Sequence, residues 1–397
     1  MRRHSRAPAC VLNGEPMAGP LSPSQDRAGA LLSIDLAALV ENWRILKTRC
    51  AARDTGAVVK ADGYGTGAVQ AAAALKSAGC ATFYVAHLDE GIAVRGAIGP
   101  GPRVVVMHGP NRGTERDFAT HKLIPVLNTP EQIAGWRKYA EAADILSESL
   151  VHVDTGMNRL GLTRREFDAH MADGGFDGLH PLALMSHLAC SEMQHPLNET
   201  QRTLFAEMLS IFKTTFPDAK ASFANSSGIF LAPAYHYDYA RPGVALYGVN
   251  PTPDAPNPML PVVRLFAKII QVRRVDRAGT VGYGATAAVP EGAKLATVSI
   301  GYADGIPRSW GTGGAGFVDG IRCPVKGRVS MDLVIFDVSN VPDSGLHPGA
   351  LMEVVGSHST VDDVATAAGT IGYEILTSLG ARYHRHYLPA PTLNKKP

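Results

Sequence analysis

Short apolar runs alternate with longer stretches of helical period from residue 32 to residue 241. Each run has the length and the turn-forming flanks of a buried β-strand. The stretches between them place apolar residues three and four positions apart, as amphipathic helices do, for example in residues 35–46, 130–143 and 198–216. Eight such units predict an α/β protein with an eight-stranded parallel (β/α)8 barrel of the TIM type. The predicted strands are residues 57–60, 82–86, 104–108, 124–127, 150–154, 182–187, 221–225 and 239–241.

The pattern changes after residue 260, where strands alternate with short turns that contain glycine, as in residues 267–272, 294–300 and 333–338. A mostly β C-terminal domain is therefore expected, followed by one helix over residues 360–379. The proline-rich stretch 251–261 reads as the linker. We accordingly expect three parts: a flexible extension over residues 1–30, the barrel over 31–260 and the β-rich domain over 261–397.

Composition excludes several classes of function. The net charge is only +2 and both signs are interspersed, so neither nucleic acid nor a membrane surface is an expected partner. The five cysteines are scattered without a C-x-x-C pair, which argues against a zinc site or a disulfide framework. The first thirty residues contain no apolar run of the length that a secretory signal needs. We expect a cytoplasmic globular protein without a metal.

Polar residues follow the predicted barrel strands at the end where such barrels carry their chemistry. Lys60 ends the first strand, His187 ends the sixth, and Arg241 ends the eighth. A lysine at the end of an apolar strand can act as a nucleophile or base if burial lowers its pKa. A solvated surface lysine is the simpler reading of that segment taken alone.

Seven separated segments strengthen the functional reading. They are, in chain order, VVKADGYGTG, HVDTGMNRLG, SHLA, ANSSG, RPGVALYG, VGYG with IGYADGIPR, and GRVSMD. This ordered set resembles the motifs of alanine racemases of the barrel-fold, fold-type III pyridoxal-phosphate class, from Leu32 to Leu388. The resemblance implies a homodimeric isomerase that uses pyridoxal 5'-phosphate and shares its active sites across the subunit interface.

The resemblance assigns the two proton carriers of racemisation. Lys60 binds the cofactor as an imine and serves as one base, and Tyr283 of the partner subunit serves as the other on the opposite face. A phenol is a poor base at neutral pH, so it needs cationic neighbours. His187 and Arg241 match the network that supplies them, and an arginine beside the pyridine nitrogen leaves the ring neutral.

The same resemblance assigns binding residues. The positions that match cofactor contacts are Lys60, Tyr64, Arg159, Asn225, Ser226, Arg241, Gly243, Val244 and Tyr373. The positions that match substrate contacts are Arg159, the amide of Met331, and Tyr302. The positions that resemble the lining of the entry passage are Tyr302, Arg308, Arg328 and Glu192. For these four residues, a solvent-exposed rim without a function is an equally good interpretation.

Two positions depart from the family pattern. A lysine, often carbamylated, commonly stands seven residues before the arginine, whereas this chain has His152 there; Asn158 replaces a usual glycine. Histidine cannot form the carbamate that would hold Arg159. We therefore expect a bound anion or a water-bridged contact to hold Arg159, with activity retained.

Three hypotheses for function remain open from the sequence. The first is an alanine racemase that makes D-alanine for peptidoglycan. The second is a racemase for serine or a broader range of amino acids, because the bulk of Tyr302 and Tyr373 discriminates one methylene by only about 1–3 kcal/mol. The third is a non-catalytic pyridoxal-phosphate homeostasis protein, which would resemble the barrel alone and lack the Tyr283 segment.

Overall fold

The computed structural model describes residues 22–389, which divide into two compact units. One unit comprises residues 37–260, and the other combines residues 22–36 with residues 261–389. Of the extension expected over residues 1–30, residues 1–21 lie outside the described residues, and Pro23–Arg27 form the short helix α1. The barrel was expected to begin at residue 31, but strand β1 (Ala30–Asp35) lies in the second unit, where it pairs with two C-terminal strands.

The first unit is a parallel barrel, as the apolar pattern predicted. Its strands are hydrogen-bonded in the order β2-β10-β9-β8-β7-β6-β5-β4-β3. Only Gly56 separates β2 from β3, so these two short strands count as one interrupted strand. The nine strands therefore occupy the eight strand positions of the barrel. The strands are β2 (Asp54–Thr55), β3 (Ala57–Val58), β4 (Thr82–Val85), β5 (Arg103–Val106), β6 (Ile124–Leu127), β7 (Glu148–His152), β8 (His180–Met185), β9 (Lys220–Ser222) and β10 (Tyr239–Ala240).

The barrel closes at Gly56. The amide of Gly56 donates to the carbonyl of Ala240 at 3.0 Å, and the amide of Val58 donates to the carbonyl of Pro242 at 2.9 Å. On the other side, β3 pairs in parallel with β4. The first predicted strand, 57–60, is therefore shorter than expected, because the chain leaves the sheet after Val58 and Lys60 begins helix α3 (Lys60–Tyr64).

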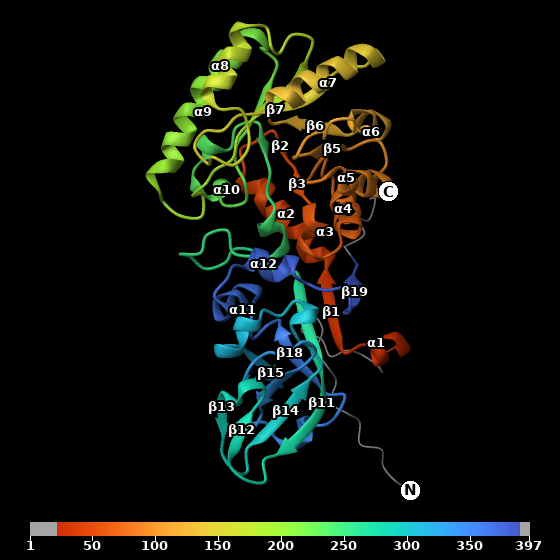
Figure 1. Ribbon diagram of the computed structural model, residues 1–397, viewed down its shortest axis with the longest axis vertical. Coiled ribbons are helices and arrows are strands. Elements are labelled where there is room, and N and C mark those ends of the chain that lie inside the picture. Colours follow the sequence, from red (N-terminus) through yellow and green to blue (C-terminus); the bar gives the residue numbers. More distant parts are fainter. Residues whose placement is uncertain (1–21, 390–397) are drawn as a thin grey trace, which may run out of the picture. The chain divides into compact units, whose positions relative to one another are not determined.

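Helices cover the outside of the barrel (Figure 1). The three predicted amphipathic stretches correspond to α2 (Leu36–Arg49), α7 (Pro130–Ala143) and α9 (Pro196–Thr215). In α9 the buried side chains include Gln201, Phe205, Met208 and Phe212, whose spacing places them on one face. The remaining helices are α4 (Ala68–Ser77), α5 (Leu88–Ile98), α6 (Glu115–Thr120), α8 (Arg164–Ala172) and α10 (Gly228–Leu231).

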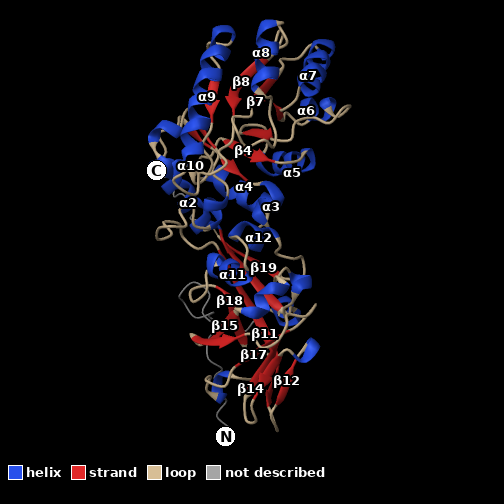
Figure 2. Ribbon diagram, turned by 60° about the vertical axis from the view of Figure 1, so that its left-hand side comes forward, coloured by secondary structure: helices blue, strands red, loops and turns tan. Residues whose placement is uncertain are grey.

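The second unit is rich in β-structure, as predicted (Figure 2). Its main sheet runs β16-β15-β18-β11-β1-β19, and β14 joins β11 to β17. Strand β1 pairs antiparallel with β11 and parallel with β19, so both ends of the described chain meet in this sheet. Its other strands are β11 (Val263–Arg274), β12 (Gly279–Val281), β13 (Ala287–Val289), β14 (Lys294–Val298), β15 (Ala315–Val318), β16 (Ile321–Pro324), β17 (Val334–Asp337), β18 (Leu351–Val355) and β19 (His384–Leu388).

The single helix predicted for residues 360–379 is wrong in one respect, because it is two helices. Helix α11 (Val361–Ala368) begins at the capping residue Thr360 and ends at Gly369, whose φ of 70° is left-handed. A glycine in this conformation ends a helix by turning the chain out of the helical path. Helix α12 (Gly372–Thr377) then carries Tyr373.

The described residues include neither a membrane-spanning helix nor a cluster of metal-ligating side chains. No helix among the described residues is long and apolar enough to cross a membrane. Nor do residues 22–389 bring together three or more metal-ligating side chains.

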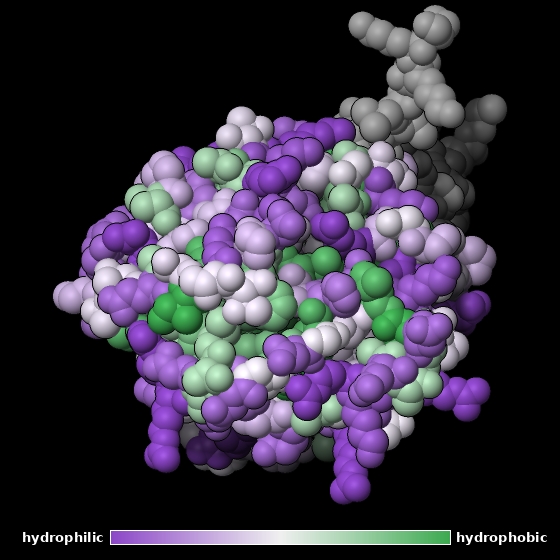
Figure 3. Space-filling model, turned by 90° about the horizontal axis from the view of Figure 1, so that it is seen from above, coloured by the Kyte–Doolittle hydropathy of each residue, from purple (hydrophilic) through white to green (hydrophobic). Residues whose placement is uncertain are grey.

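On the face shown in Figure 3, hydrophobic residues gather near the middle and hydrophilic residues surround them.

The closure of the barrel makes Gly56 sensitive to substitution. In Gly56→Ala the new Cβ would lie 2.7 Å from the Tyr84 ring and 2.8 Å from the Thr82 carbonyl oxygen. We expect a loss of about 1–3 kcal/mol in the free energy of unfolding, because neither neighbour can move away without disturbing the sheet. Urea unfolding should show a lower midpoint for this variant.

Gly96→Ala is the matched control. Gly96 lies in α5, and a Cβ there meets nothing within 4 Å. This change should leave stability unchanged or raise it by up to about 1 kcal/mol, because alanine favours helix. Equal loss in both variants would contradict the role assigned to Gly56.

Candidate active site

Lys60 stands at the start of an unusual turn. The following residues Ala61, Asp62, Gly63 and Tyr64 have φ values of 52°, 52°, 62° and 53°, so the chain makes a left-handed helical turn. Each non-glycine residue in this conformation costs about 1–2 kcal/mol. Such a turn persists only where surrounding contacts hold it.

Glu90 on α5 supplies those contacts. One carboxylate oxygen accepts from the amide of Ala61 at 2.6 Å, and the other accepts from the amides of Ala86 and His87 at 2.8 and 3.1 Å. Asp62 adds a second brace, because its carboxylate accepts from the amide of Ala68 at 2.9 Å. These hydrogen bonds therefore fix the backbone on which the Lys60 side chain stands.

The amine of Lys60 is partly buried and makes no hydrogen bond or ion pair with any other residue that the structure describes. Burial and the positive charge of Arg159 lower its pKa, and the carboxylate of Glu90 opposes this shift. A lowered pKa increases the share of neutral amine, which is the form that attacks a carbonyl carbon or accepts a proton.

Arg241 lies fully within the barrel at the ends of three strands. Its guanidinium donates to the hydroxyl of Ser222 at 2.5 Å, to the carbonyl of Ser186 at 2.6 Å and to the carbonyl of Phe223 at 3.5 Å. Burial lowers the pKa of Arg241 to about 10, so the side chain keeps its charge at neutral pH.

His187 is coupled to this guanidinium. Its Nδ1 lies 3.4 Å from Arg241 Nη2, and because arginine only donates, Nδ1 is the acceptor. Burial and the charges of Arg241 and Arg159 hold the pKa of His187 well below its usual range. The imidazole is therefore neutral, and its proton is on Nε2, where it can be donated to a third group.

Backbone amides converge near Ser226. Its hydroxyl accepts from the amides of Gly243 at 2.9 Å and Ala245 at 3.3 Å, while the buried amide of Val244 has no acceptor among the described residues. A Cβ on Gly243 would lie 2.3 Å from the hydroxyl of Tyr64, so only glycine fits there. A buried amide without an acceptor, beside two small residues, suits an oxygen of a phosphate group.

The side-chain oxygen of Asn225 holds this segment in place. This oxygen accepts from the hydroxyl of Ser191 and the amide of Gly228, both at 2.9 Å. Tyr64 is buried and stacks on Tyr247 with ring centroids 4.7 Å apart. Burial raises the pKa of Tyr64, so its hydroxyl keeps the proton that a hydrogen bond to an anion requires.

The loop that carries Arg159 folds back on strand β7. The amide of Leu162 donates to the carbonyl of His152, and the amide of Asp154 donates to the carbonyl of Leu162, both at 2.8 Å. Asn158 has a φ of 54°, which explains one departure from the family pattern, because asparagine is among the non-glycine residues that best tolerate this region. Arg159 is exposed and has no ion pair with a described residue.

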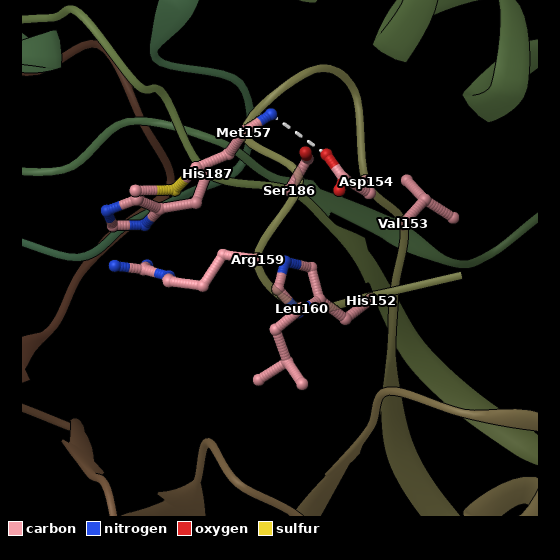
Figure 4. Close-up of a pocket in the computed structure, with 8 residues that line it drawn as sticks. All are labelled: His152, Val153, Asp154, Met157, Arg159, Leu160, Ser186 and His187. Carbon is pink, nitrogen blue, oxygen red and sulfur yellow. Dashed lines mark hydrogen bonds between the residues drawn. The ribbon is translucent and has the colours of Figure 1, made fainter. Parts of the chain in front are cut away.

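Eight residues line a small cavity behind this loop (Figure 4). His152 is buried within it, and burial together with Arg241 lowers its pKa to about 3. The lining residues are His152, Val153, Asp154, Met157, Arg159, Leu160, Ser186 and His187.

In the second unit three sequence motifs meet. Gly327, next to Arg328, lies against the carbonyl of Val281, and the guanidinium of Arg328 lies beside Gly284, so that the VGYG and GRVSMD segments adjoin. The amides of Tyr302 and Ala303 donate to the carbonyls of Ser330 and Met331, both at 3.0 Å. The apolar side chains at this junction are unusually exposed: Tyr283 at 73%, Met331 at 53%, Tyr302 at 43% and Leu333 at 37%.

Two residues of the candidate site, Glu90 and Asn128, were not predicted from the sequence. Glu90 stands three residues after His87 at the start of α5, a spacing that often marks a carboxylate that binds backbone amides at a helix start. Asn128, whose side-chain oxygen lies 2.8 Å from His152 Nδ1, gave no signal beyond its place after a predicted strand.

Two further residues were predicted to line the entry passage. Arg308 lies in the 3-10 helix Arg308–Thr312, and Glu192 is exposed in the barrel unit.

The chain has the features of a class of two-domain proteins. They are a parallel barrel that carries Lys60, Arg159 and Arg241 at one end, and a β-rich unit that follows it in the sequence. The alanine racemase N-terminal domain model matches residues 34–251, and the C-terminal domain model matches residues 262–387. The chain belongs to the alanine racemase family. Because both domains match, the alternative of a barrel-only homeostasis protein is not favoured.

Individual relatives agree with this assignment. The chain is 48% identical over 366 residues to the alanine racemase of Rhodospirillum rubrum, covering 91% of this chain and 97% of the relative. It is 48% identical over 367 residues to a catabolic alanine racemase of Mesorhizobium japonicum, covering 92% and 95%. The solved structure of alanine racemase from Bartonella henselae, which holds covalently bound pyridoxal phosphate, has a TM-score of 0.86 at 36% identity and covers 91% of this chain and 100% of that one.

Glu90→Ala tests the mounting of Lys60. We expect a lower free energy of unfolding by about 1–3 kcal/mol, because the amides of Ala61, Ala86 and His87 lose their common acceptor. Limited proteolysis should also cleave faster within the turn at residues 60–67, since its left-handed residues are no longer braced. Glu141→Ala, an exposed site at the end of α7, is the control and should change neither readout. Unchanged proteolysis in Glu90→Ala would mean that the turn holds itself.

Proposed function

We propose that this protein interconverts L-alanine and D-alanine with pyridoxal 5'-phosphate as cofactor. The observation that carries the proposal is the group at one end of the barrel: Lys60 with a lowered pKa, and His187 coupled to the buried Arg241. Family membership supports the same activity. The product D-alanine would serve peptidoglycan synthesis in the cytoplasm.

The residues present fit the cofactor. The buried amide of Val244 lacks an acceptor among the described residues, and Gly243 leaves space beside the hydroxyl of Tyr64, as a phosphate group requires. Ser226, Gly243, Val244, Tyr64 and Tyr373 would hold that phosphate, Arg241 would contact the pyridine nitrogen, and Arg159 the phenolic oxygen. When bound, pyridoxal phosphate supplies the carbonyl carbon that condenses with an amine and a ring that draws electrons from the substrate α-carbon.

Lys60 and Tyr283 move the proton at the α-carbon. Lys60 Nζ removes or returns it on one face, because its lowered pKa leaves part of the amine neutral. Tyr283 of the partner subunit does the same on the other face. His187 Nε2–H donates to the phenolic oxygen and favours its deprotonated form. Two carriers on opposite faces invert the configuration, whereas one carrier returns the proton to the side it left.

Arg241 limits the reaction to proton transfer. Its guanidinium keeps its proton near neutral pH, since burial lowers its pKa only to about 10, so Arg241 would offer the pyridine nitrogen of a bound cofactor a hydrogen bond but no proton and would leave that ring a weaker electron acceptor. Arg159 and the amide of Met331 bind the substrate carboxylate, and Tyr302 limits the size of the side chain.

We further propose a homodimer in which Tyr283, Tyr302 and Met331 complete the partner's site. Their exposure supports this, because large apolar side chains that lie together at a surface commonly mark an interface. In a two-fold dimer each subunit then lends these residues to the other.

Lys60→Ala and Tyr283→Phe should separate the two faces. We expect no racemisation in Lys60→Ala and a loss of at least about 10²-fold in Tyr283→Phe, because each removes one proton carrier. The measurement is α-proton exchange in deuterium oxide, followed by chiral analysis of alanine and serine. Tyr283→Phe should retain exchange from one enantiomer only.

The controls for this experiment are Lys138→Ala and Tyr139→Phe on the outer helix α7. Both should behave as the natural enzyme does. Exchange from both enantiomers in Tyr283→Phe would overturn the two-carrier assignment, and faster turnover of serine than alanine would overturn the substrate.

Mixing the two inactive variants tests the shared site. Subunits of Lys60→Ala and Tyr283→Phe, unfolded and refolded together in equal amounts, should recover about a quarter of natural activity, because half of the dimers are hybrids and each has one intact site of two. Recovery of nothing would mean that both residues act within one subunit.

A further inference from the structure

His152 is a buried titratable group to which the proposed reaction gives no part. Its Nδ1 lies 2.8 Å from the side-chain oxygen of Asn128, and its ring lines the cavity beside Arg159. The position of the proton on this ring decides what the cavity can hold.

The neighbours of Asn128 settle the position of that proton. The Asn128 amide nitrogen donates to the carbonyl oxygens of Met107 at 3.1 Å and Val126 at 3.0 Å, and reversing the amide would set oxygen against oxygen. Gln132 fixes the same segment, because its side-chain oxygen accepts from the backbone amide of Asn128 at 2.8 Å. The Asn128 oxygen must therefore accept, so Nδ1 of His152 carries the hydrogen.

The other ring nitrogen, Nε2, is then a hydrogen-bond acceptor. Burial and the positive charges of Arg241 and Arg159 disfavour a second proton, and the carboxylate of Asp154 opposes them only in part, so the pKa of His152 falls to about 3. Near neutral pH the ring is uncharged, with one fixed donor and one fixed acceptor.

No direct hydrogen bond joins this acceptor to Arg159 among the described residues. The cavity that both residues line measures about 10 Å³, which is about the space that one water molecule needs. In Figure 4 the Arg159 side chain starts beside the His152 ring and runs toward His187. The backbone bonds of Leu162 and Asp154 hold the loop that carries Arg159 against the strand that carries His152.

We propose that His152 is a positioning residue that holds Arg159 through one water molecule. The water donates to His152 Nε2 and accepts from the guanidinium of Arg159. A halide is the poorer occupant, because it offers no hydrogen to Nε2 and would face that lone pair. Of the two possibilities that the sequence left open, an anion or a water bridge, the geometry selects the water bridge.

This arrangement leaves the site more positive than a negatively charged carbamate at this position would. An uncharged acceptor orients Arg159 without neutralising it, so the full positive charge remains for the substrate carboxylate. This step rests on the proposed function, since it takes Arg159 to bind that carboxylate.

Neutron crystallography of the perdeuterated holoenzyme is the direct test. We expect deuterium on His152 Nδ1, none on Nε2, and one water between Nε2 and Arg159. Deuterium on both nitrogens, or an anomalous peak in the cavity of crystals grown in bromide, would overturn the proposal. This result does not depend on turnover, so it separates the proposal from the proposed function.

Two substitutions measure the consequence. His152→Gln retains a side-chain acceptor and should keep KM for alanine within about threefold, while His152→Leu should raise KM about tenfold or more with a smaller change in kcat, because a charge-assisted contact is lost. His180→Leu, on an exposed histidine of the same barrel, is the control. Equal KM values for the glutamine and leucine variants would contradict the positioning role.

Discussion

The buried guanidinium of Arg241 is the constraint on which the candidate site depends. A charge removed from water is strongly unfavourable unless hydrogen bonds surround it. Here Ser186, Ser222 and Phe223 supply acceptors from the ends of β8 and β9. The strand ends must therefore stand at fixed spacing around one side chain, and the barrel gives them that spacing because its strands are hydrogen-bonded in a closed order.

The same charge acts on two histidines whose hydrogen-bond partners give them opposite roles. Burial, together with the charge of Arg241, lowers the pKa of both His187 and His152, so each ring is neutral. His187 accepts from Arg241 at Nδ1 and keeps a donor at Nε2, whereas His152 faces Asn128 at Nδ1 and keeps an acceptor at Nε2. One donor and one acceptor thus point into the site from adjacent strands, and neither requires a net charge of its own.

Much of this structure followed from the sequence, since strand length, helical period and the polar residues after each strand are local patterns. The barrel and the β-rich second unit were predicted on that basis, whereas Lys60, expected to end a strand, begins helix α3, and His187 and Arg241 lie just beyond the ends of β8 and β10. The pairing of β1 with β11 and β19 was not, because it joins segments more than 200 residues apart. The break at Gly369 does have a local signal in the sequence, because a glycine within a helical pattern can end the helix.

Contacts between distant residues explain the features that local patterns miss. A left-handed turn after Lys60 contradicts the preferences of Ala61 and Asp62, and the carboxylate of Glu90, from another strand–helix unit, helps to hold it together with the local bond from Asp62. The cost has a physical use, because a backbone that cannot relax leaves the motion to the four methylene groups of the lysine. In the proposed reaction this amine first binds the cofactor and then carries a proton, which requires a long, mobile side chain on a fixed backbone, and the strained turn provides that backbone.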